Sequence, residues 1–294
     1  MTCGLTIIVL AMNESVHISR AISSARRLTD SVWVVDSHST DDTAALAQAA
    51  GARVVNCDGR SFSEKLNWAL VNLPIDTPWV MRLDADELLT DALVSGLAPA
   101  LATLPDDVCG VYVRRQLWFM GQWIKHGGMY PTWSMRLWRR GCAVCESRNL
   151  DEHMLLTRGT ARWLKFDVID SPLTDLTSWI AKHNRYSSME AATARAGTAQ
   201  EQLLRPRLFG TSVERARWLK LNVFYRVPGM MRAVLYFGYR YVLRGGFLDG
   251  RKGLIFHVLH GFWYRFLVDA KLFEMTVDQH PAWPGKQQHR SARD

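Results

Sequence analysis

Long apolar runs free of charge are absent from the sequence, and so are the features of a secretory leader. No run reaches the roughly 18 residues that a membrane-spanning helix requires. The amino terminus enters a strand-like apolar run at once, without a basic region followed by a cleavage site. We therefore expect a cytoplasmic protein with neither a signal peptide nor a membrane-spanning helix.

Two glycine-rich signatures of nucleotide-binding proteins are missing as well. The first apolar run is not followed by G-x-G-x-x-G, which argues against a dinucleotide-dependent dehydrogenase. The loop G-x-x-x-x-G-K-[ST] is also absent, which argues against a P-loop kinase. A nucleotide site in this chain would have to be built in another way.

Cysteines are few and scattered. They are Cys3, Cys57, Cys109, Cys142 and Cys145. The last two form a C-x-x-C, but no second pair accompanies it, as a zinc site of this type would need. We expect reduced thiols in a cytoplasmic protein, with a zinc or redox role as the alternative.

Positive charge is what the sequence has in excess. The 294 residues carry a formal net charge of +8 and have a sequence pI of about 9.4. Hydrophobic residues make up 48% and charged residues 22%, which is ordinary for a globular protein. The excess suggests an anionic partner, namely nucleotide phosphates, nucleic acid or an anionic membrane surface.

The first half alternates strand-like apolar runs with helical patterns. Strands are expected at Leu5–Met12, Ser31–Val35 and Ala52–Asn56 and from Trp79 onward, and helices around Ala21–Ala25 and at Ala44–Ala50 and Phe62–Leu73. This alternation predicts an α/β fold with a mostly parallel sheet flanked by helices. In such sheets ligands bind beyond the carboxyl ends of the strands.

The chain is organised around the stretch from Trp79 to Leu89, in which an apolar strand ends on Asp84, Asp86 and Glu87. Burying a lone carboxylate is costly unless it is paired or binds a cation. The D-x-D spacing suits a divalent cation that shares its coordination with substrate phosphates. Taken alone, the motif would favour the alternative, a solvated acidic turn that caps the next helix.

The surroundings favour the metal. Two other predicted strands also end on polar residues, at Asn13-Glu14 and at Asp36-Ser37. All three strand ends should converge on one crevice. The alternatives are that Asn13 caps a helix and that Asp36 is a cap or turn residue. A carboxylate there could also accept hydrogen bonds from a base or a ribose.

Three segments, TIIVLAMNES, VVDSHSTDDT and VMRLDADE, resemble in order and spacing the first half of family 2 glycosyltransferases with the GT-A fold. The resemblance spans roughly residues 5–156 and implies an inverting nucleotide-sugar transferase. It implies that Asn13 and Glu14 lie near the nucleotide and that Asp36 reads the uracil. Asp84 and Asp86 would hold Mg²⁺ or Mn²⁺. The family often has Asp-Gly or Asn-Gly where this chain has Ser37-His38.

Other residues complete the expected sites. The donor site is predicted to include Ser37, Lys65 and Ala85 in addition. Tryptophans and arginines are dense after Gly110, where a strand around Val111 and Val113 is expected to end at Arg114 and Arg115. Aromatic faces and guanidinium donors suit a sugar or a phosphorylated acceptor. The acceptor candidates are Arg114, Trp118, Trp123 and Trp133. At least half of the tryptophans in this stretch are expected to belong to the core instead.

Inverting transfer needs a carboxylate that takes a proton from the acceptor hydroxyl. The candidates are Asp151 and Glu152. The resemblance implies an acidic residue preceding a helix here, and we favour Glu152. The alternative is that Asp151 caps that helix. His153 is expected to be a supporting hydrogen-bond partner rather than a metal ligand.

The second half begins with a predicted helix at Leu176–Ala196, and from residue 197 the chain is basic and aromatic. The segments Leu219–Phe237 and Leu254–Phe273 are too charged to span a bilayer but suit its interface. The alternative is two amphipathic helices packed on the catalytic domain. This half resembles glycosyltransferases of lipopolysaccharide-core and exopolysaccharide type, including enzymes that add a β-glucosyl residue to inner-core heptose. We predict a catalytic domain at 1–196 and a membrane-associating region at 197–294.

The sequence thus predicts a metal-dependent, inverting transferase of a hexose from a UDP-sugar. The acceptor would be a lipid-linked saccharide, either lipopolysaccharide core or a polyprenyl-diphosphate glycan. The enzyme would act at the cytoplasmic face of the inner membrane, peripheral to its anionic surface and without nucleic acid. The alternatives are a nucleotidyltransferase, which should carry a glycine-rich loop near its first strand, and a non-catalytic basic adaptor for membranes or nucleic acid.

Overall fold

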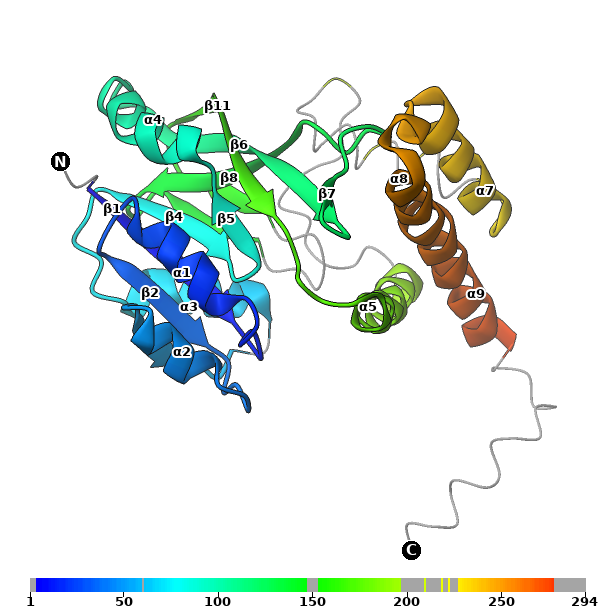
Figure 1. Ribbon diagram of the computed structural model, residues 1–294, viewed down its shortest axis with the longest axis horizontal. Coiled ribbons are helices and arrows are strands. Elements are labelled where there is room, and N and C mark those ends of the chain that lie inside the picture. Colours follow the sequence, from blue (N-terminus) through cyan, green and yellow to red (C-terminus); the bar gives the residue numbers. More distant parts are fainter. Residues whose placement is uncertain are drawn as a thin grey trace, which may run out of the picture. The chain divides into compact units, whose positions relative to one another are not determined.

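The computed structural model describes residues 4–59, 61–146, 153–196, 209, 218, 222 and 227–277 (Figure 1). The chain folds into two compact units. The sheet unit comprises Met1–Thr174 and Arg244–Leu254, and the helical unit comprises Asp175–Leu243 and Ile255–Asp294. This division differs from the predicted boundary after residue 196. Helix α5, Leu176–Ala196, packs on the C-terminal helix α9, Tyr264–Val277, and therefore belongs to the helical unit.

A large mixed sheet forms the centre of the sheet unit. Its strands are β1 Leu5–Ala11, β2 Val32–Asp36, β3 Arg53–Asn56, β4 Trp79–Asp84, β5 Glu87–Leu89, β6 Val108–Phe119, β7 Gln122–Trp123, β8 Thr132–Arg139 and β11 Thr160–Asp170. They follow the order β3-β2-β1-β4-β8-β6-β11-β5, with β7 paired to β6. The first four strands in this order run parallel, as the sequence predicts, whereas β8 is antiparallel to both of its neighbours.

Helices cover both faces of the sheet. They are α1 Ile18–Arg26, α2 Thr43–Ala49, α3 Phe62–Asn72 and α4 Asp91–Ala102. Helices α1, α2 and α4 contribute to the apolar core on one face. Helix α3 packs on the other face together with a small sheet of β9 Ala143–Cys145 and β10 Met154–Leu156. The predicted helices and strands of the first half are therefore confirmed. One correction concerns β6, which does not end at Arg115 but runs on to Phe119.

The register of the sheet brings the predicted strand ends together. Ala11 at the end of β1 lies opposite Asp36 on β2, and Leu10 lies opposite Asp84 on β4. Adjacent strands are about 4.8 Å apart, so these two carboxylates flank the end of β1 at the same edge. At the last pair in this strand order, Asp170 of β11 lies opposite Glu87 of β5.

The helical unit is built around two long helical stretches. Helix α5 spans Leu176–Ala196, as predicted, and α9 spans Tyr264–Val277. Glu190 of α5 accepts hydrogen bonds from Tyr264 and Arg265 of α9. A buried ion pair of Arg232 and Asp269 joins α7, Met231–Gly238, to α9.

Glycines at positions 245, 246 and 250 interrupt the C-terminal helices. A π-helical turn, Tyr239–Leu243, follows α7, and a 3-10 turn, Gly246–Asp249, precedes α8, Gly250–Phe256. Gly245 and Gly250 both have positive φ, at 70° and 64°, which the absence of a side chain permits. A second π-helical segment, His257–Trp263, connects α8 to α9.

The predicted helical segment 254–273 is thereby confirmed, whereas most of 219–230 and all of 280–294 lie outside the described residues. Across the residues that the structure describes, none of the helices combines the length and apolarity needed to cross a bilayer.

Candidate functional site

Two loops interlock beyond the ends of β1 and β2. The side-chain oxygen of Asn13 accepts the N–H of Thr40 at 2.8 Å, and the Ser39 hydroxyl accepts the N–H of Asn13 at 2.8 Å. The N–H of Glu14 donates to the Thr43 hydroxyl at 2.7 Å. Asn13 holds a positive φ of 56°, which an asparagine adopts more readily than most residues. The structure thus places two predicted nucleotide residues in one rigid loop pair.

Asp36 lies at the base of this loop pair. Its side chain is buried and accepts both the backbone N–H of Ser39, at 2.8 Å, and the Ser39 hydroxyl. This arrangement fits the alternative of a turn residue, and it also fixes the carboxylate at the sheet edge. The hydroxyl of the neighbouring Ser37 is buried and has no hydrogen-bond partner among the described residues. Ser37 is therefore a donor that a ligand at this edge could use.

A histidine that the sequence analysis missed supports Glu14. The His17 Nε2 atom accepts the backbone N–H of Leu173 at 2.9 Å. The proton of the neutral ring must then lie on Nδ1, which donates to Glu14 Oε2 at 2.6 Å. His17 thereby connects the first loop to the segment after β11. The three-residue spacing of Glu14 and His17 was the available signal.

The loop after β3 completes this side of the edge. Its Asp58 carboxylate lies 2.6 Å from Nε2 of His38, which has a positive φ of 55°. Lys65 on α3 lies against Gly59, where an added Cβ would come within 2.8 Å of the Lys65 side chain. The loops after β1, β2 and β3 are thus linked in series, and Lys65 belongs to the same group.

Asp84 at the end of β4 is engaged by arginines. Arg82 donates from Nε and one terminal nitrogen, at 2.9 and 3.1 Å. Arg136 of β8 donates to the same carboxylate at 3.2 and 3.3 Å. Burial alone would raise the pKa of Asp84, but the two arginines outweigh it and hold the pKa well below its usual range. Asp84 is therefore a charged carboxylate whose oxygens already have cationic partners.

Glu87 shares Arg136 with Asp84. Both Glu87 and Arg136 are almost fully buried, and they form a close ion pair. Burial raises the pKa of Glu87, the Arg136 charge opposes this rise, and the Asp84 charge adds to it. The alternative of a solvated acidic turn is wrong, because these carboxylates lie inside a charge network. The cap of α4 is instead the Thr90 hydroxyl, which accepts the N–H of Leu93.

Removing Arg136 should destabilise the sheet unit. We expect Arg136→Met to lower the free energy of unfolding by about 3–5 kcal/mol, because it leaves buried carboxylates without their cation. Adding Glu87→Gln should recover part of this loss. Urea unfolding followed by circular dichroism measures both, with the exposed Arg162→Met on β11 as the control. A loss for Arg136→Met no larger than that of the control would contradict the role of this ion pair.

Asp86 lies in the turn between β4 and β5, next to a third arginine. Its backbone carbonyl accepts the N–H of Ser171 at 3.1 Å and approaches Arg20 of α1 at 3.4 Å. Burial lowers the pKa of Arg20, while the charges of Asp86 and Asp170 oppose that shift. Ala85, also predicted for the donor site, packs its side chain into the core. Only the backbone of Ala85 can therefore meet a donor.

The acidic turn offers a divalent cation two carboxylates, those of Asp84 and Asp86. The described residues contain no cluster of three or more His, Cys, Asp or Glu side chains arranged as a metal site. Mg²⁺ commonly binds through only one or two carboxylates and completes its coordination with substrate phosphates and water. The Asp84 oxygens accept hydrogen bonds from two guanidinium groups, so a cation at this turn would share Asp84 with Arg82 and Arg136.

The acceptor candidates gather around one arginine. Arg114 on β6 pairs with Asp167 on β11 at 2.9 Å, and Tyr130 donates its hydroxyl hydrogen to the same carboxylate at 2.9 Å. The Arg114 guanidinium lies 5.5 Å from the ring of Tyr130 and 6.0 Å from that of Trp133. Trp123 packs edge-on against Tyr130, with ring centroids 4.9 Å apart. Tyr130 and Asp167 are members that the sequence analysis missed.

Most tryptophans of this stretch are not core residues. Of the tryptophans at positions 118, 123, 133 and 138, only Trp138 is buried. The expectation that at least half of them would be core is therefore wrong. Trp118 lies opposite Trp123 in the β6–β7 pair and donates to Gln116 at 3.4 Å. The rings of Trp123 and Trp133 near Arg114 are therefore half-buried and keep part of their surface exposed.

The predicted base residues Asp151 and Glu152 lie outside the described residues. The residues that flank them are joined, since the N–H of Glu146 donates to the carbonyl of His153 at 2.9 Å. The chain then enters strand β10 at Met154, not a helix. The expected helix after these carboxylates, and with it the helix-cap alternative for Asp151, is therefore wrong.

Comparison with known proteins identifies the sheet unit. Residues 6–170 match the family model described as glycosyl transferase family 2. The chain belongs to this family. The matched region ends with β11, and it contains every strand of the large sheet except part of β1. Family membership and the helix-flanked α/β sheet together confirm the predicted GT-A class of fold and the prediction of a glycosyltransferase.

Individual relatives differ in how much of the chain they match. An uncharacterized glycosyltransferase of Rickettsia conorii is 40% identical over 99 residues, and the match covers 32% of each chain. This chain thus aligns with about a third of that relative's length. The lipopolysaccharide core biosynthesis glycosyltransferase LpsC of Rhizobium meliloti is 28% identical over 281 residues, 92% of each chain.

Among solved structures, glucosyl-3-phosphoglycerate synthase of Mycobacterium tuberculosis, crystallised with Mg²⁺ and UDP, is 27% identical to this chain. The superposition covers 38% of this chain and 43% of that one, with a TM-score of 0.33.

Proposed function

We propose that the protein transfers a hexose from a UDP-sugar to a lipid-linked saccharide, with inversion, at the cytoplasmic face of the inner membrane. The observation that carries this proposal is the register that sets Asp36 and Asp84 on either side of the end of β1. Similarity to LpsC over 92% of both chains supports a lipopolysaccharide-core acceptor, with a polyprenyl-diphosphate glycan as the other candidate.

The donor would bind along the edge formed by the first loops. Asp36 and Ser37 would receive the uracil, and the loop pair of Asn13 and Glu14 would hold the ribose side. Lys65 would contribute a positive charge. Ser37 supplies a buried hydroxyl that lacks a protein partner among the described residues, as a ligand-binding donor would.

The diphosphate would lie at the end of β4. A divalent cation, Mg²⁺ or Mn²⁺, neutralises charge on a departing diphosphate when it is bound. Asp84 and Asp86 would hold that cation, with Asp84 kept in place by Arg82 and Arg136. Arg20, beside Asp86, adds a fixed positive charge near the same turn.

The acceptor would be bound beside Arg114 and activated by a carboxylate. The half-buried faces of Trp123 and Trp133, with Tyr130, offer stacking surfaces for a sugar ring. Glu152, or else Asp151, would take the proton from the acceptor hydroxyl as it attacks the anomeric carbon.

Hydrolysis of a panel of UDP- and GDP-sugars by the purified protein tests the donor class. We expect slow release of UDP from one or more UDP-hexoses in the presence of Mn²⁺ and none from GDP-sugars. Activity with GDP-sugars alone would contradict the assignment of Asp36 and Ser37 to uracil. Formation of UMP and a sugar 1-phosphate instead of UDP would favour the nucleotidyltransferase, because the attack would then occur at the α-phosphorus.

The membrane-facing surface would be an apolar stripe along α7 and the π-helical turn that follows it. Met231, Val234, Leu235 and Val242 recur at helical spacing, and each is more than half exposed. Such an exposed apolar stripe on a helix suits the interface of a bilayer. The predicted membrane-associating region at 197–294 contains this stripe.

We expect the double substitution Val234→Ser and Leu235→Ser to lower partition onto vesicles containing phosphatidylglycerol by about tenfold or more. The variant lacks two aliphatic side chains that the wild-type protein would bury in the bilayer. Vesicle co-sedimentation measures this partition. The control is Val71→Ser on α3, where the valine is 82% exposed in the sheet unit. Equal binding by both variants would show that the α7 stripe does not meet the bilayer.

A further inference from the structure

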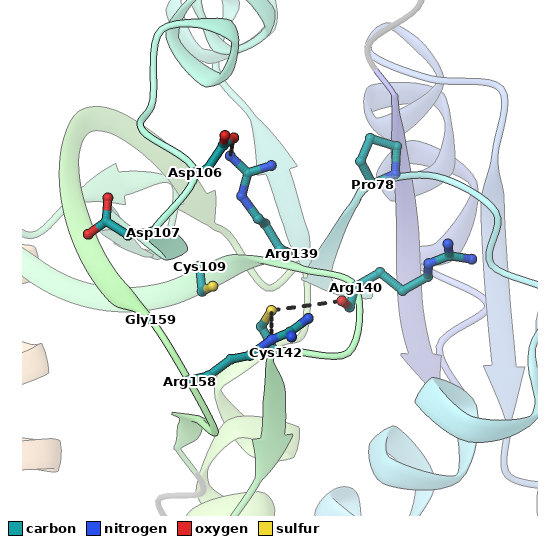
Figure 2. Close-up of a pocket in the computed structure, with 9 residues that line it drawn as sticks. All are labelled: Pro78, Asp106, Asp107, Cys109, Arg139, Arg140, Cys142, Arg158 and Gly159. Carbon is teal, nitrogen blue, oxygen red and sulfur yellow. Dashed lines mark hydrogen bonds and ion pairs between the residues drawn. The ribbon is translucent and has the colours of Figure 1, made fainter.

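A cavity of about 500 Å³ opens at the end of the sheet away from the donor site (Figure 2). Its wall includes Pro78, which precedes β4, whereas Asp84 ends that strand. Figure 2 shows two thiols and three guanidinium groups around this space. They belong to Cys109, Cys142, Arg139, Arg140 and Arg158.

The two thiols lie next to each other in the lining of the cavity (Figure 2). Cys109 is 5% exposed and Cys142 is 2% exposed, and both are free. The thiol of Cys109 interacts directly with that of Cys142. Gly159 makes room for this pair, because a Cβ at that position would lie 2.4 Å from the Cys109 sulfur. A small, uncharged reagent could enter the cavity where a protein could not.

The surroundings of the two sulfurs differ. Arg158 donates its Nε hydrogen to the Cys142 sulfur at 3.2 Å. The Cys142 thiol also approaches the carbonyl of Arg140 at 3.8 Å. Burial, followed by the neighbouring Cys142, raises the pKa of the Cys109 thiol, so Cys109 keeps its proton. Cys142, whose sulfur contacts a guanidinium group, is the attacking sulfur of the pair.

Two further guanidinium groups add positive charge. Arg139 donates Nε to the carbonyl of Val108 at 2.9 Å, and Arg140 donates to the carbonyl of Ile75 at 2.6 Å. These partners are neutral. Two carboxylates also line the cavity. Asp106 is fully exposed and lies 3.7 Å from Arg139, so solvent screens that ion pair, and Asp107 accepts the hydroxyl hydrogen of Thr160 at 3.1 Å. Three guanidinium groups thus face two carboxylates. The cavity therefore keeps an electropositive wall beside Cys142.

We propose that Cys142 and Cys109 form a peroxide-reactive dithiol that closes to a disulfide. The Cys142 thiolate attacks one oxygen of hydrogen peroxide, the O–O bond breaks, and the departing hydroxide takes a proton and leaves as water. The Cys109 sulfur then attacks the sulfenic acid, the S–O bond breaks, and a second water leaves with the Cys109 proton. Two thiols and one peroxide thus give one disulfide and two waters.

Peptide mapping of the full-length protein under non-reducing conditions tests the proposal. After brief treatment with hydrogen peroxide and alkylation, we expect a cross-link between the peptides of Cys109 and Cys142, lighter by two hydrogens and reversed by dithiothreitol. In Cys109→Ser, Cys142 should carry a sulfenic acid that dimedone traps. Cys57 and Cys145, which are buried and outside the lining of this cavity, should remain reduced during the peroxide treatment and be recovered in alkylated form.

The role of Arg158 is tested separately. Arg158→Met should slow oxidation of Cys142 by about threefold or more, because the sulfur loses its guanidinium hydrogen-bond donor. The control is the exposed Arg162→Met on β11. Oxidation of Cys142 and Cys109 no faster than that of Cys57 in the wild-type protein, or a cross-link of Cys142 to Cys145, would overturn the proposal. Since the first readout uses the unaltered chain, it does not depend on whether the variants fold.

Discussion

Replacing Asp86 with alanine is expected to lower turnover of sugar transfer by about 10²- to 10⁴-fold, which corresponds to several kcal/mol of lost charge stabilisation at the departing diphosphate. The fold should persist, because Asp86 lies in the turn between β4 and β5 and the substitution keeps the backbone carbonyl that accepts the Ser171 N–H. Measurement of UDP release with donor and acceptor present gives the turnover.

The matched control for this substitution is Asp106→Ala. Asp106 is an exposed carboxylate at the other end of the sheet, next to the cavity of Figure 2. It should leave turnover within about twofold of the wild-type value, since exposed ion pairs contribute little. Near-normal turnover of Asp86→Ala would remove the metal-holding role from this residue.

The second large effect is expected at the base. Glu152→Gln should lower turnover by about 10²- to 10⁴-fold, because an amide cannot accept the proton of the acceptor hydroxyl. Affinity for UDP should stay unchanged, since the proton transfer occurs at the acceptor and not at the nucleotide. Single-turnover kinetics with titrated donor separates the two quantities.

Asp151→Asn is the companion variant. If Glu152 is the base, Asp151→Asn should keep most of the turnover and the acidic limb of the pH profile. Full turnover in Glu152→Gln together with loss in Asp151→Asn would move the base by one position. Loss of UDP affinity in Glu152→Gln would instead assign this residue to donor binding.

The first two strands could be predicted because each is an uninterrupted apolar run rich in β-branched residues. Leu5–Ala11 and Val32–Asp36 are buried on both faces, so apolar and polar residues do not alternate along them. Each run ends clearly at the first polar residue. The carboxyl ends of parallel strands share an edge, so the meeting of Asp36 with Asp84 followed from the order of elements.

The arginine partners could not be predicted in the same way. Arg136 reaches Asp84 and Glu87 because β8 enters the sheet antiparallel, between β4 and β6. The neighbouring residues of Arg136, SMRLW at positions 134–138, do not distinguish it from an arginine that faces solvent. The same holds for Arg20 and Asp86, which lie far apart in sequence and meet only when α1 packs on β5.

The acceptor side was predicted in part. The dense aromatic residues were visible, but Asp167, the carboxylate that holds Arg114 and Tyr130, comes from a distant strand. The expected helix after Asp151 failed because β10 pairs with β9 through residues that also suit a helix. Propensity in so short a segment is overridden by tertiary pairing.

The central claim is that the acidic turn after β4 holds a divalent ion against the diphosphate of a uridine nucleotide. Isothermal titration of UDP into the wild-type protein and Asp86→Ala, with and without Mn²⁺, tests it most directly. The account predicts UDP binding that strengthens at least about tenfold with Mn²⁺ in the wild-type protein and does not respond to Mn²⁺ in the variant. An equal response to Mn²⁺ in both proteins, or no UDP binding by the wild-type protein, would contradict it.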